Sequence, residues 1–331
     1  MKRLNLKRFL VGAFLLLLGI FFSIQYSCQG PQRKYGDRPH GTFSISGAFA
    51  LYPLTVKWVE EFRKEYPDIQ VDVSAGGAGK GMADVLANMV DLGMFSREVT
   101  PAELEKGAWY IAVAKDAVVP TLNSENPFKE QLLSKGLSQA VFAELYTLEK
   151  KWLWSDVNDV INSRSPIHIY TRSDACGAAQ VWASYLGTDQ ESLKGIGVFG
   201  DPGMTDAVTK DEMGMGYNNV AYAYDVNTRQ KYEGIEILPI DFNGNGQIDS
   251  VENVYQSLDS LMKAISTGVY PSPPARELYF ISKGKPNNKL VNLFLNWVLT
   301  KGQQYVARAG YVGLSEDHIT KQLRLLEDEA H

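Results

Sequence analysis

Residues 241–252 form a run of twelve that carries oxygen-bearing side chains at the spacing of a calcium-binding loop. The run reads Asp-Phe-Asn-Gly-Asn-Gly-Gln-Ile-Asp-Ser-Val-Glu. An EF-hand loop needs oxygen ligands at positions one, three, five, seven, nine and twelve, the seventh from a main-chain carbonyl, and glycine at position six. The required ligands are present as Asp241, Asn243, Asn245, Gln247 (through its carbonyl), Asp249 and Glu252, with Gly246 at the turn. Hard oxygen ligands favour Ca²⁺, so we expect one structural Ca²⁺ here; a polar turn without metal is the alternative.

The flanks of this loop differ from those of a paired EF-hand. Residues 236–240 look like an extended segment, and residues 251–265 are spaced like a helix. We therefore expect a single loop–helix site that holds its surroundings in place, and not a sensor that opens and closes.

Four other loops carry groups suited to holding an anion. They span residues 46–50, 76–81, 96–97 and 172–178, and each lies where a predicted strand gives way to a helix or turn. Main-chain N–H groups at helix N-termini bind anions, and an anion taken out of water needs a fixed counter-charge. We therefore expect the loops to line one cleft, with Arg172 as the main charged donor. Arg97 is a second donor candidate; the alternative for Arg97 is a surface pair with Glu98 or Glu103.

A thiol in the last of these loops raises an enzyme hypothesis. Cys176 is placed at a predicted helix N-terminus, where a thiol pKa is lowered, and His168 lies upstream as an imaginable base. His168, however, belongs to an alternating strand and should point away, and no orienting group or oxyanion pair is visible. We expect no enzyme activity, and interpret Cys176 as a small, weak donor beside a ligand.

The elements needed to position these loops follow an α/β pattern. Strands are predicted over 42–46, 69–73, 90–94 and 167–170; helices are predicted from Pro53, over 82–89, 178–186, 290–298 and 302–309. Strand–loop–helix units in series predict a sheet with helices on its faces. In such sheets ligands bind at the carboxyl ends of the strands.

The first 28 residues have the layout of an export signal. Residues 2–8 contain the four basic residues, residues 9–22 are apolar, and Ser27-Cys28 precedes a polar stretch. A cysteine at this point resembles a bacterial lipoprotein site, with lipid on Cys28, although Gln25 stands where leucine is usual. An uncleaved anchor and a plain secretory signal are the alternatives. Each places residues 40–331 outside the cytoplasm, in the periplasm, after a tether over residues 29–40.

Composition supports a globular chain and excludes one class of partner. Hydrophobic residues make up 45% and charged residues 21% of the 331 residues, and the net charge is −5. Without the basic leader, 29 basic residues face 38 acidic ones. A chain this acidic is unsuited to nucleic acid. Any anion must be held by local donors.

The loops, taken in order, resemble those of one known family. Residues 45–54 resemble the first anion loop of periplasmic phosphate-binding proteins, 76–81 the second, 90–97 the third and 172–178 the fourth. Three further stretches look like family features in the same order: 115–120, 214–224 and 301–312. The resemblance implies an α/β, two-lobed periplasmic-binding-protein fold with a ligand cleft between the lobes, here with the calcium loop inserted.

The resemblance also implies a role and a division of the chain. It implies a monomeric solute-binding protein that captures phosphate by hinge closure and delivers it to the permease subunits of an ABC importer, anchored to the membrane by lipid. Lobe I would comprise residues 41–115 plus 271–331, and lobe II residues 116–270 with the calcium loop. The implied ligand-binding residues are Ala48, Phe49, Gly77, Ala78, Ser96, Arg97, Arg172, Cys176, Gly177 and Ala178.

The chain departs from the family at the hydroxyl donors. Ala48, Ala78, Cys176 and Ala178 stand where serine or threonine is usual, and Ser96 stands where the best-known members carry the aspartate that accepts a phosphate proton. Each lost donor is worth about 1–3 kcal/mol beside a buried charged acceptor. Two interpretations of the ligand remain. The ligand is phosphate, or it is a different solute, either another oxyanion or a small organic acid whose apolar part packs on the apolar side chains. A sensing or scaffolding protein of the same fold is the alternative to transport.

The missing aspartate leads to an expectation about selectivity. With Ser96 in the acceptor position, we expect relaxed discrimination, so that an oxyanion without a proton, such as sulfate, is admitted. A strong preference for phosphate would indicate another acceptor, with Asp174 and Asn218 as candidates.

Overall fold

A mixed sheet forms the centre of the computed structural model, which describes residues 38–157 and 159–327. Its strand order is β2-β1-β3-β11-β4-β8-β6-β7, and β9 also pairs with β4. The strands are β1 (Gly41–Gly47), β2 (Ile69–Ala75), β3 (Leu92–Phe95), β4 (Ala108–Asn123), β6 (His168–Arg172), β7 (Ile196–Val198), β8 (Gly214–Asn219), β9 (Ile235–Ile237) and β11 (Ala275–Lys283). A separate parallel pair joins β5 (Leu137–Ser138) to β10 (Ile240–Asp241).

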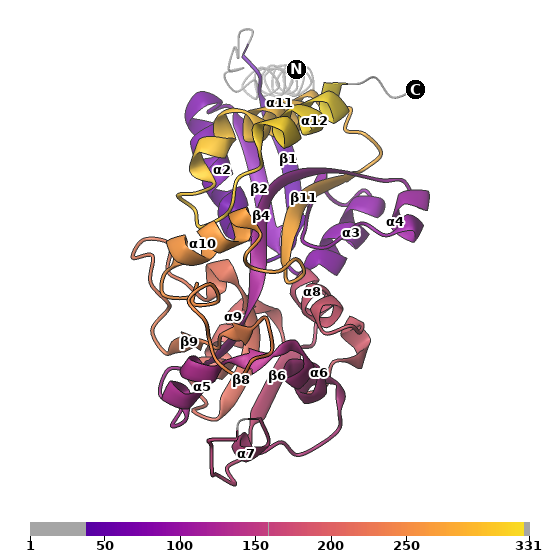
Figure 1. Cartoon of the computed structure of the whole chain (residues 1–331). Coiled ribbons are helices and arrows are strands. Elements are labelled where there is room, and N and C mark those ends of the chain that lie inside the picture. Colours follow the sequence, from indigo (N-terminus) through magenta and orange to yellow (C-terminus); the bar gives the residue numbers. More distant parts are fainter. Residues whose placement is uncertain (1–37, 158, 328–331) are drawn as a thin grey trace, which may run out of the picture. The chain divides into compact units, whose positions relative to one another are not determined.

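Helices cover the sheet in two groups (Figure 1). Around β1–β3 and β11 lie α2 (Tyr52–Glu65), α3 (Ala78–Leu86), α4 (Pro101–Glu105), α11 (Lys289–Leu299) and α12 (Glu316–Glu327). Around β6–β9 lie α5 (Lys129–Lys135), α6 (Gln139–Thr147), α7 (Trp154–Val157), α8 (Gly177–Tyr185) and α9 (Gly200–Thr209). The helix α10 (Leu258–Thr267) packs its buried residues into the hydrophobic core of the second group.

The long strand β4 belongs to both groups. Residues 108–117 pair with β11, whereas residues 118–123 pair with β8 and β9. Two hydrophobic cores form on either side of this change, one from residues 43–114 and 278–326, the other from residues 117–275 together with Val312. The chain therefore folds as two α/β lobes, for which we keep the names lobe I and lobe II. The strand β4 and the segment before β11 cross between the two lobes.

Glycine and proline place the helices that follow the strands. Pro53 lies in the first turn of α2, as predicted. The helix α3 begins at Ala78, earlier than the predicted residue 82, because Gly77 with φ of +91° turns the chain directly out of β2. Residues 301–305 form a 3₁₀ helix where an α-helix over 302–309 was predicted.

The segment after the expected calcium loop also differs from the prediction. A helix was expected from residue 251, but α10 starts at Leu258, where the Ser257 side chain accepts from the Ser260 N–H. Residues 250–252 form a turn instead.

The export signal, Cys28 and most of the tether lie outside the described residues, which begin at residue 38. Within the described ranges, no helix combines the length and the apolar character that crossing a membrane requires.

Candidate anion site

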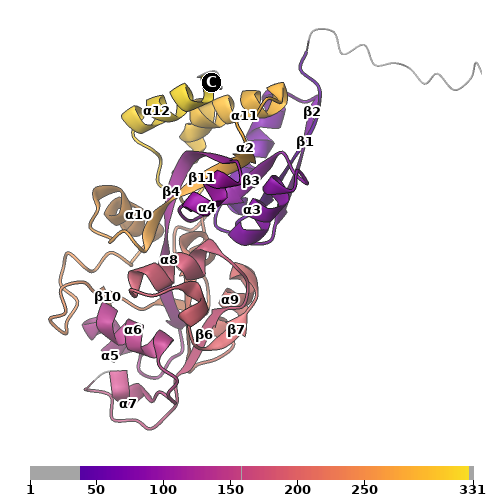
Figure 2. The ribbon, with the colours of Figure 1, turned by 90° about the vertical axis from the view of Figure 1, so that its right-hand side faces the viewer.

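The predicted loops meet where the two lobes touch. The Gly79 N–H of lobe I donates to the Ala175 carbonyl of lobe II at 3.0 Å. A Cβ added at Gly177 would lie 2.2 Å from Ser96 Oγ, so these two residues are in direct contact. The side view in Figure 2 shows α3 above α8; Gly79 lies in the first turn of α3, and Gly177 is the first residue of α8. Loops from both lobes therefore enclose one small region.

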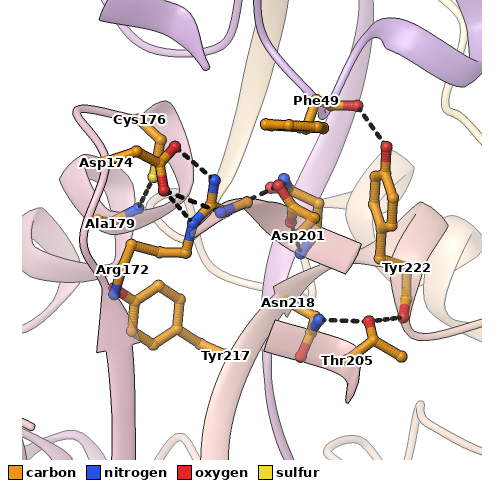
Figure 3. Close-up of polar contacts among 12 residues, drawn as sticks. Phe49, Arg172, Asp174, Cys176, Ala179, Asp201, Thr205, Tyr217, Asn218 and Tyr222 are labelled. Atoms are coloured by element: carbon orange, nitrogen blue, oxygen red, sulfur yellow. Dashed lines mark hydrogen bonds and ion pairs between the residues drawn. The ribbon is translucent and has the colours of Figure 1, made fainter. Parts of the chain in front are cut away.

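Arg172 lies at the centre of this region (Figure 3). It ends β6, and its side chain is only 1% exposed. Asp174 receives a fork of two hydrogen bonds, from Nε at 2.8 Å and Nη2 at 2.7 Å. A second carboxylate, Asp201, accepts from Nη1 at 2.8 Å. The guanidinium is thus held between two acids.

Asp201 is the residue that sequence reasoning missed. It is the second residue of α9 and is 1% exposed. Its Oδ1 accepts from Nδ2 of Asn219 at 2.6 Å and from the Asn219 N–H at 3.3 Å. No helix was predicted over α9, and an acid in the first turn of a helix is common on helix surfaces and does not indicate burial.

A carboxylate, Asp201, lies beside Arg172, but it comes from α9 and not from the third loop. The relaxed selectivity expected from the sequence stays a prediction. Asn218, one of the two acceptors considered from the sequence, is engaged elsewhere: its Oδ1 accepts from Thr121 and its Nδ2 donates to Thr205.

The electrostatic balance of the cluster keeps the arginine charged. Burial alone would lower the pKa of Arg172, but Asp201, Cys176 and Asp174 oppose it, and the pKa is raised above its usual value. Arg172 with Asp174 and Asp201 carries a net charge of −1 when all three are ionised.

Cys176 caps the helix that follows Arg172. Its Sγ accepts from the Ala179 N–H at 3.4 Å, the bond that a serine hydroxyl would make at a helix N-cap. Burial raises the pKa of the thiol to about 12, so the expectation of a lowered pKa at this helix terminus is wrong. His168, the residue considered as a base for this thiol, instead contacts Asp211, with its Nδ1 2.7 Å from Asp211 Oδ2.

Arg97 pairs with a carboxylate of its own lobe, and its assignment as a ligand-binding residue stays a prediction. Its Nη1 and Nη2 donate to the two carboxylate oxygens of Glu103, at 2.9 and 2.7 Å, and Nη1 also donates to the Glu98 carbonyl. The guanidinium lies 4.5 Å from the centre of the Phe95 ring. The alternative considered from the sequence, pairing with Glu103, is the observed one.

The alanines of the predicted set are buried in the two hydrophobic cores on either side of the region. Ala48 and Ala78 are each 1% exposed and Ala178 is 2% exposed. The Phe49 ring centre lies 5.9 Å from the Arg172 guanidinium carbon, and the Phe49 carbonyl accepts from the Tyr222 hydroxyl at 3.3 Å. Figure 3 shows Phe49 reaching from lobe I toward Arg172 and Tyr222 of lobe II.

A cavity of about 1090 Å³ lies between the lobes and is lined by members of the second, third and fourth loops, but by none of residues 46–50 and not by Arg172. Gly79, Cys176 and Arg97 line it, together with Arg276 on β11. Arg276 bonds to Asp116 and Asn219, but its buried Nη1 has no hydrogen-bond partner among the described residues. A buried donor without a partner is costly, and Arg276 is also one of the residues that line the cavity.

Among the predicted calcium ligands, the carboxylates of Asp241 and Glu252 accept from main-chain N–H groups, whereas Asn243 and Asn245 donate to Asp249. Asp241 is 5% exposed, and its carboxylate accepts from the N–H groups of Gly244, Asn245 and Gly246. Glu252 is 3% exposed and accepts from Phe242, Asn243 and Asp249 N–H groups. In the part of the chain that the structure describes, no three His, Cys, Asp or Glu side chains are gathered as a metal centre.

Comparison with known proteins decides the family. The family model described as PBP superfamily domain matches residues 34–301, which is most of the chain. The chain belongs to the PBP superfamily. The PBP match covers lobe II, all four loops, and lobe I up to residue 301.

Several PBP relatives carry names that concern phosphate. The phosphate-binding protein PstS of Staphylococcus saprophyticus is 24% identical over 324 residues, covering 96% of this chain and 92% of its own length. The PstS of Methanocaldococcus jannaschii is 25% identical over 328 residues, covering 83% and 82%.

Solved PBP structures show the same fold. A Clostridium perfringens protein with bound phosphate, assigned as a phosphate ABC transporter substrate-binding protein, matches with a TM-score of 0.67 and 18% identity, over 83% of this chain and 100% of its own. A phosphate transport receptor from Vibrio cholerae matches with a TM-score of 0.58 and 14% identity over the same shares. The two-lobed PBP fold predicted from the sequence is thereby confirmed.

Proposed function

We propose that this protein is an extracytoplasmic solute-binding protein that captures phosphate between its lobes and delivers it to an ABC importer. The observation that carries the proposal is the meeting of four loops from both lobes around buried Arg172, in the order they have along the chain. The names of the relatives, which are phosphate-binding proteins, support the same ligand. Binding of this kind needs no catalytic group, and we propose no enzyme activity.

The donors that remain are main-chain groups and arginines. By helix geometry, the first N–H groups of α3 and α8 have no partner within their helices, and both helices begin in this region. Five N–H donors belong to a guanidinium, and Arg172 uses three of them in the bonds described. Two donors of Arg172, the helix termini and Nη1 of Arg276 form a set suited to an oxyanion.

Thermal unfolding of the purified protein with a panel of anions tests the proposal. A ligand that binds only the folded state raises the melting temperature by mass action. Phosphate at about a hundred times its Kd should raise it by on the order of 5 °C. Short carboxylic acids belong in the panel because the loops carry apolar side chains at Ala48, Phe49, Ala78 and Ala178. Stabilisation by such an acid and none by phosphate would reassign the ligand.

Delivery to an importer is a separate part of the proposal. Transport predicts that the phosphate-loaded protein stimulates ATP hydrolysis by a reconstituted permease–ATPase complex encoded nearby. A sensor of the same fold would bind phosphate without this stimulation.

We also propose that Cys28 carries the membrane anchor. The support is the basic, apolar and Ser27-Cys28 order of the leader. Mass spectrometry of the membrane-extracted protein should find a diacylglyceryl-modified peptide beginning at Cys28. A mature chain without lipid would indicate a plain secretory signal.

A structural Ca²⁺ site over 241–252 completes the proposal. Its support is the full EF-hand ligand spacing and the burial of Asp241 and Glu252, for which no ion pair with a basic side chain is found among the described residues. An EF-hand takes several ligands from amides and a carbonyl, so it does not require a cluster of acids. Calcium would exchange the main-chain bonds of Glu252 for a bidentate contact.

A further inference from the structure

We propose that Phe199 forms, together with Phe49, an aromatic latch that holds the two lobes closed and so slows the release of a bound anion. The inference rests on the proposed capture of an anion between the lobes, and it adds a residue that sets the rate of release. Phe49 belongs to the first loop of lobe I, whereas Phe199 lies between β7 and α9 of lobe II. The centres of the two rings are 6.2 Å apart, and the ring planes meet at 86°.

The turn that carries Phe49 is fixed within lobe I. The Ala48 N–H donates to the Met94 carbonyl at 2.9 Å, and the Tyr52 N–H donates to the Phe49 carbonyl at 3.2 Å. The ring itself packs on lobe II, because a Cβ added at Gly200 would lie 3.2 Å from Phe49 Cζ. Gly200, the residue after Phe199, thus leaves room for the Phe49 ring to lie against lobe II.

Phe199 is fixed to the fourth loop, the one that follows β6. The Ser173 N–H donates to the Val198 carbonyl at 3.0 Å, one residue before Phe199. The Gly200 N–H donates to Asp174 Oδ1 at 3.1 Å, one residue after Phe199. Hydrogen bonds to the fourth loop therefore hold the chain on both sides of Phe199, so a movement of this loop carries the ring with it.

The exposure of the side chains indicates what the ring contact does. The Arg172 side chain is 1% exposed, the Phe49 ring centre lies 5.9 Å from its guanidinium carbon, and Phe199 is 62% exposed. A side chain this exposed adds little to the core of lobe II. An edge-to-face aromatic pair at this separation is worth about two- to tenfold in an equilibrium constant. Because the two rings belong to different lobes, this stabilisation exists only while the lobes are closed.

The contact should act on release and not on capture. A ligand enters while the lobes are apart and the two rings do not touch, so loss of the contact leaves the association rate constant kon unchanged. Release requires the lobes to separate, and separation breaks the contact between Phe49 and Phe199. The latch therefore lowers the dissociation rate constant koff, and it lowers the Kd in proportion.

Exchange of bound radiolabelled inorganic phosphate for an excess of unlabelled phosphate tests the latch, with the Kd measured by titration calorimetry. Phe199→Ala should raise koff by about two- to tenfold and raise the Kd by the same factor. Phe199→Tyr keeps the ring and should release phosphate like the wild type. The matched control is Ile196→Ala, which removes an apolar side chain of β7 that is 53% exposed; its koff should equal that of the wild type.

A double-mutant cycle tests whether Phe49 is the partner of Phe199. If the rings act through each other, Phe49→Leu combined with Phe199→Ala should raise koff by less than the product of the two separate effects. A full product would show that Phe199 acts independently of Phe49, which contradicts the latch.

The remaining outcomes separate this inference from the proposed function. A wild type that does not bind phosphate overturns both. A wild type that binds phosphate, with Phe199→Ala releasing it at the same rate, overturns the latch alone. A lower kon with unchanged koff in Phe199→Ala also overturns it, because Phe199 would then act during capture. Should Phe199→Ala not fold, Phe199→Leu keeps the apolar volume without the ring, and the same expectation decides.

Discussion

At the scale of single residues, Arg172 is the group whose loss should affect binding most. Arg172→Ala removes the fixed positive charge and leaves Asp174 and Asp201 facing each other across a buried space. We expect phosphate binding to weaken by at least about 2 kcal/mol, the usual cost of truncating one partner of a buried charge pair. Titration calorimetry measures this, with Arg164→Ala at an exposed position as the control. Unchanged affinity in Arg172→Ala would remove it from the site.

Cys176 should be inert in the native protein. The thiol is 5% exposed, and burial raises its pKa to about 12, so near neutral pH it is protonated and shielded. We expect negligible alkylation of Cys176 by iodoacetamide in the folded state and rapid alkylation in urea, followed by mass spectrometry of its peptide. Fast labelling of the folded protein would show a reactive thiolate and reopen the enzyme hypothesis.

The sequence predicted residue roles well where partners are close along the chain. Arg172 and Asp174 are two positions apart, and their pairing could be expected from one loop. Asp201 lies on a different helix, and its contact with Arg172 exists only once β6 and α9 pack together, so no local pattern indicated it. The pairing of Arg97 with Glu103 was easier to predict from the sequence. Thr100 and Glu103 form a capping box, which holds Glu103 close to Arg97.

At the scale of elements, the loop before α10 makes the calcium proposal testable. Asp241→Ala combined with Glu252→Ala should abolish any rise in melting temperature caused by Ca²⁺, because both proposed carboxylate ligands at the ends of the loop are lost. A chelator should lower the melting temperature of the wild type. Asn253→Ala, an exposed neighbour of Glu252, is the control and should respond like the wild type. A wild type indifferent to chelator and to added Ca²⁺ would show a polar turn without metal.

Element boundaries were predictable where glycine or proline forces the chain to turn. Pro53 marked α2 correctly, whereas the start of α10 was missed by several residues. Residues 251–255 have helical spacing of apolar side chains, but the Glu252 carboxylate is engaged by main-chain N–H groups of the preceding loop. Ser257 then supplies the cap that starts the helix. Local spacing was overridden here by hydrogen bonds specific to the loop.

At the scale of the whole molecule, contact between the lobes depends on a glycine. A Cβ at Gly177 would lie 2.2 Å from Ser96 Oγ and 2.3 Å from the Ser96 carbonyl oxygen, so Gly177→Ala cannot bring the lobes together as observed. We expect this variant to lose at least about tenfold in phosphate affinity, because closure must hold the lobes further apart. Small-angle X-ray scattering should show compaction of the wild type by phosphate and little compaction of the variant.

The control for this prediction is Gly313→Ala, where the nearest heavy atom to an added Cβ is 3.8 Å away. It should close and bind like the wild type. Wild-type affinity in Gly177→Ala would mean that the ligand-bound arrangement does not require this contact.

The late position of β11 in the chain limits the order in which the lobes can fold during synthesis. Within lobe I, β11 lies between β3 and β4, although it follows them by more than 150 residues in the chain. Its sheet therefore stays split until residues 275–283 have been made, while lobe II consists almost wholly of earlier residues. The amino-terminal strands must wait with apolar faces uncovered, a state prone to aggregation. A chain held unfolded by chaperones until export would pass this interval safely, so the topology suits a protein that folds only after crossing a membrane.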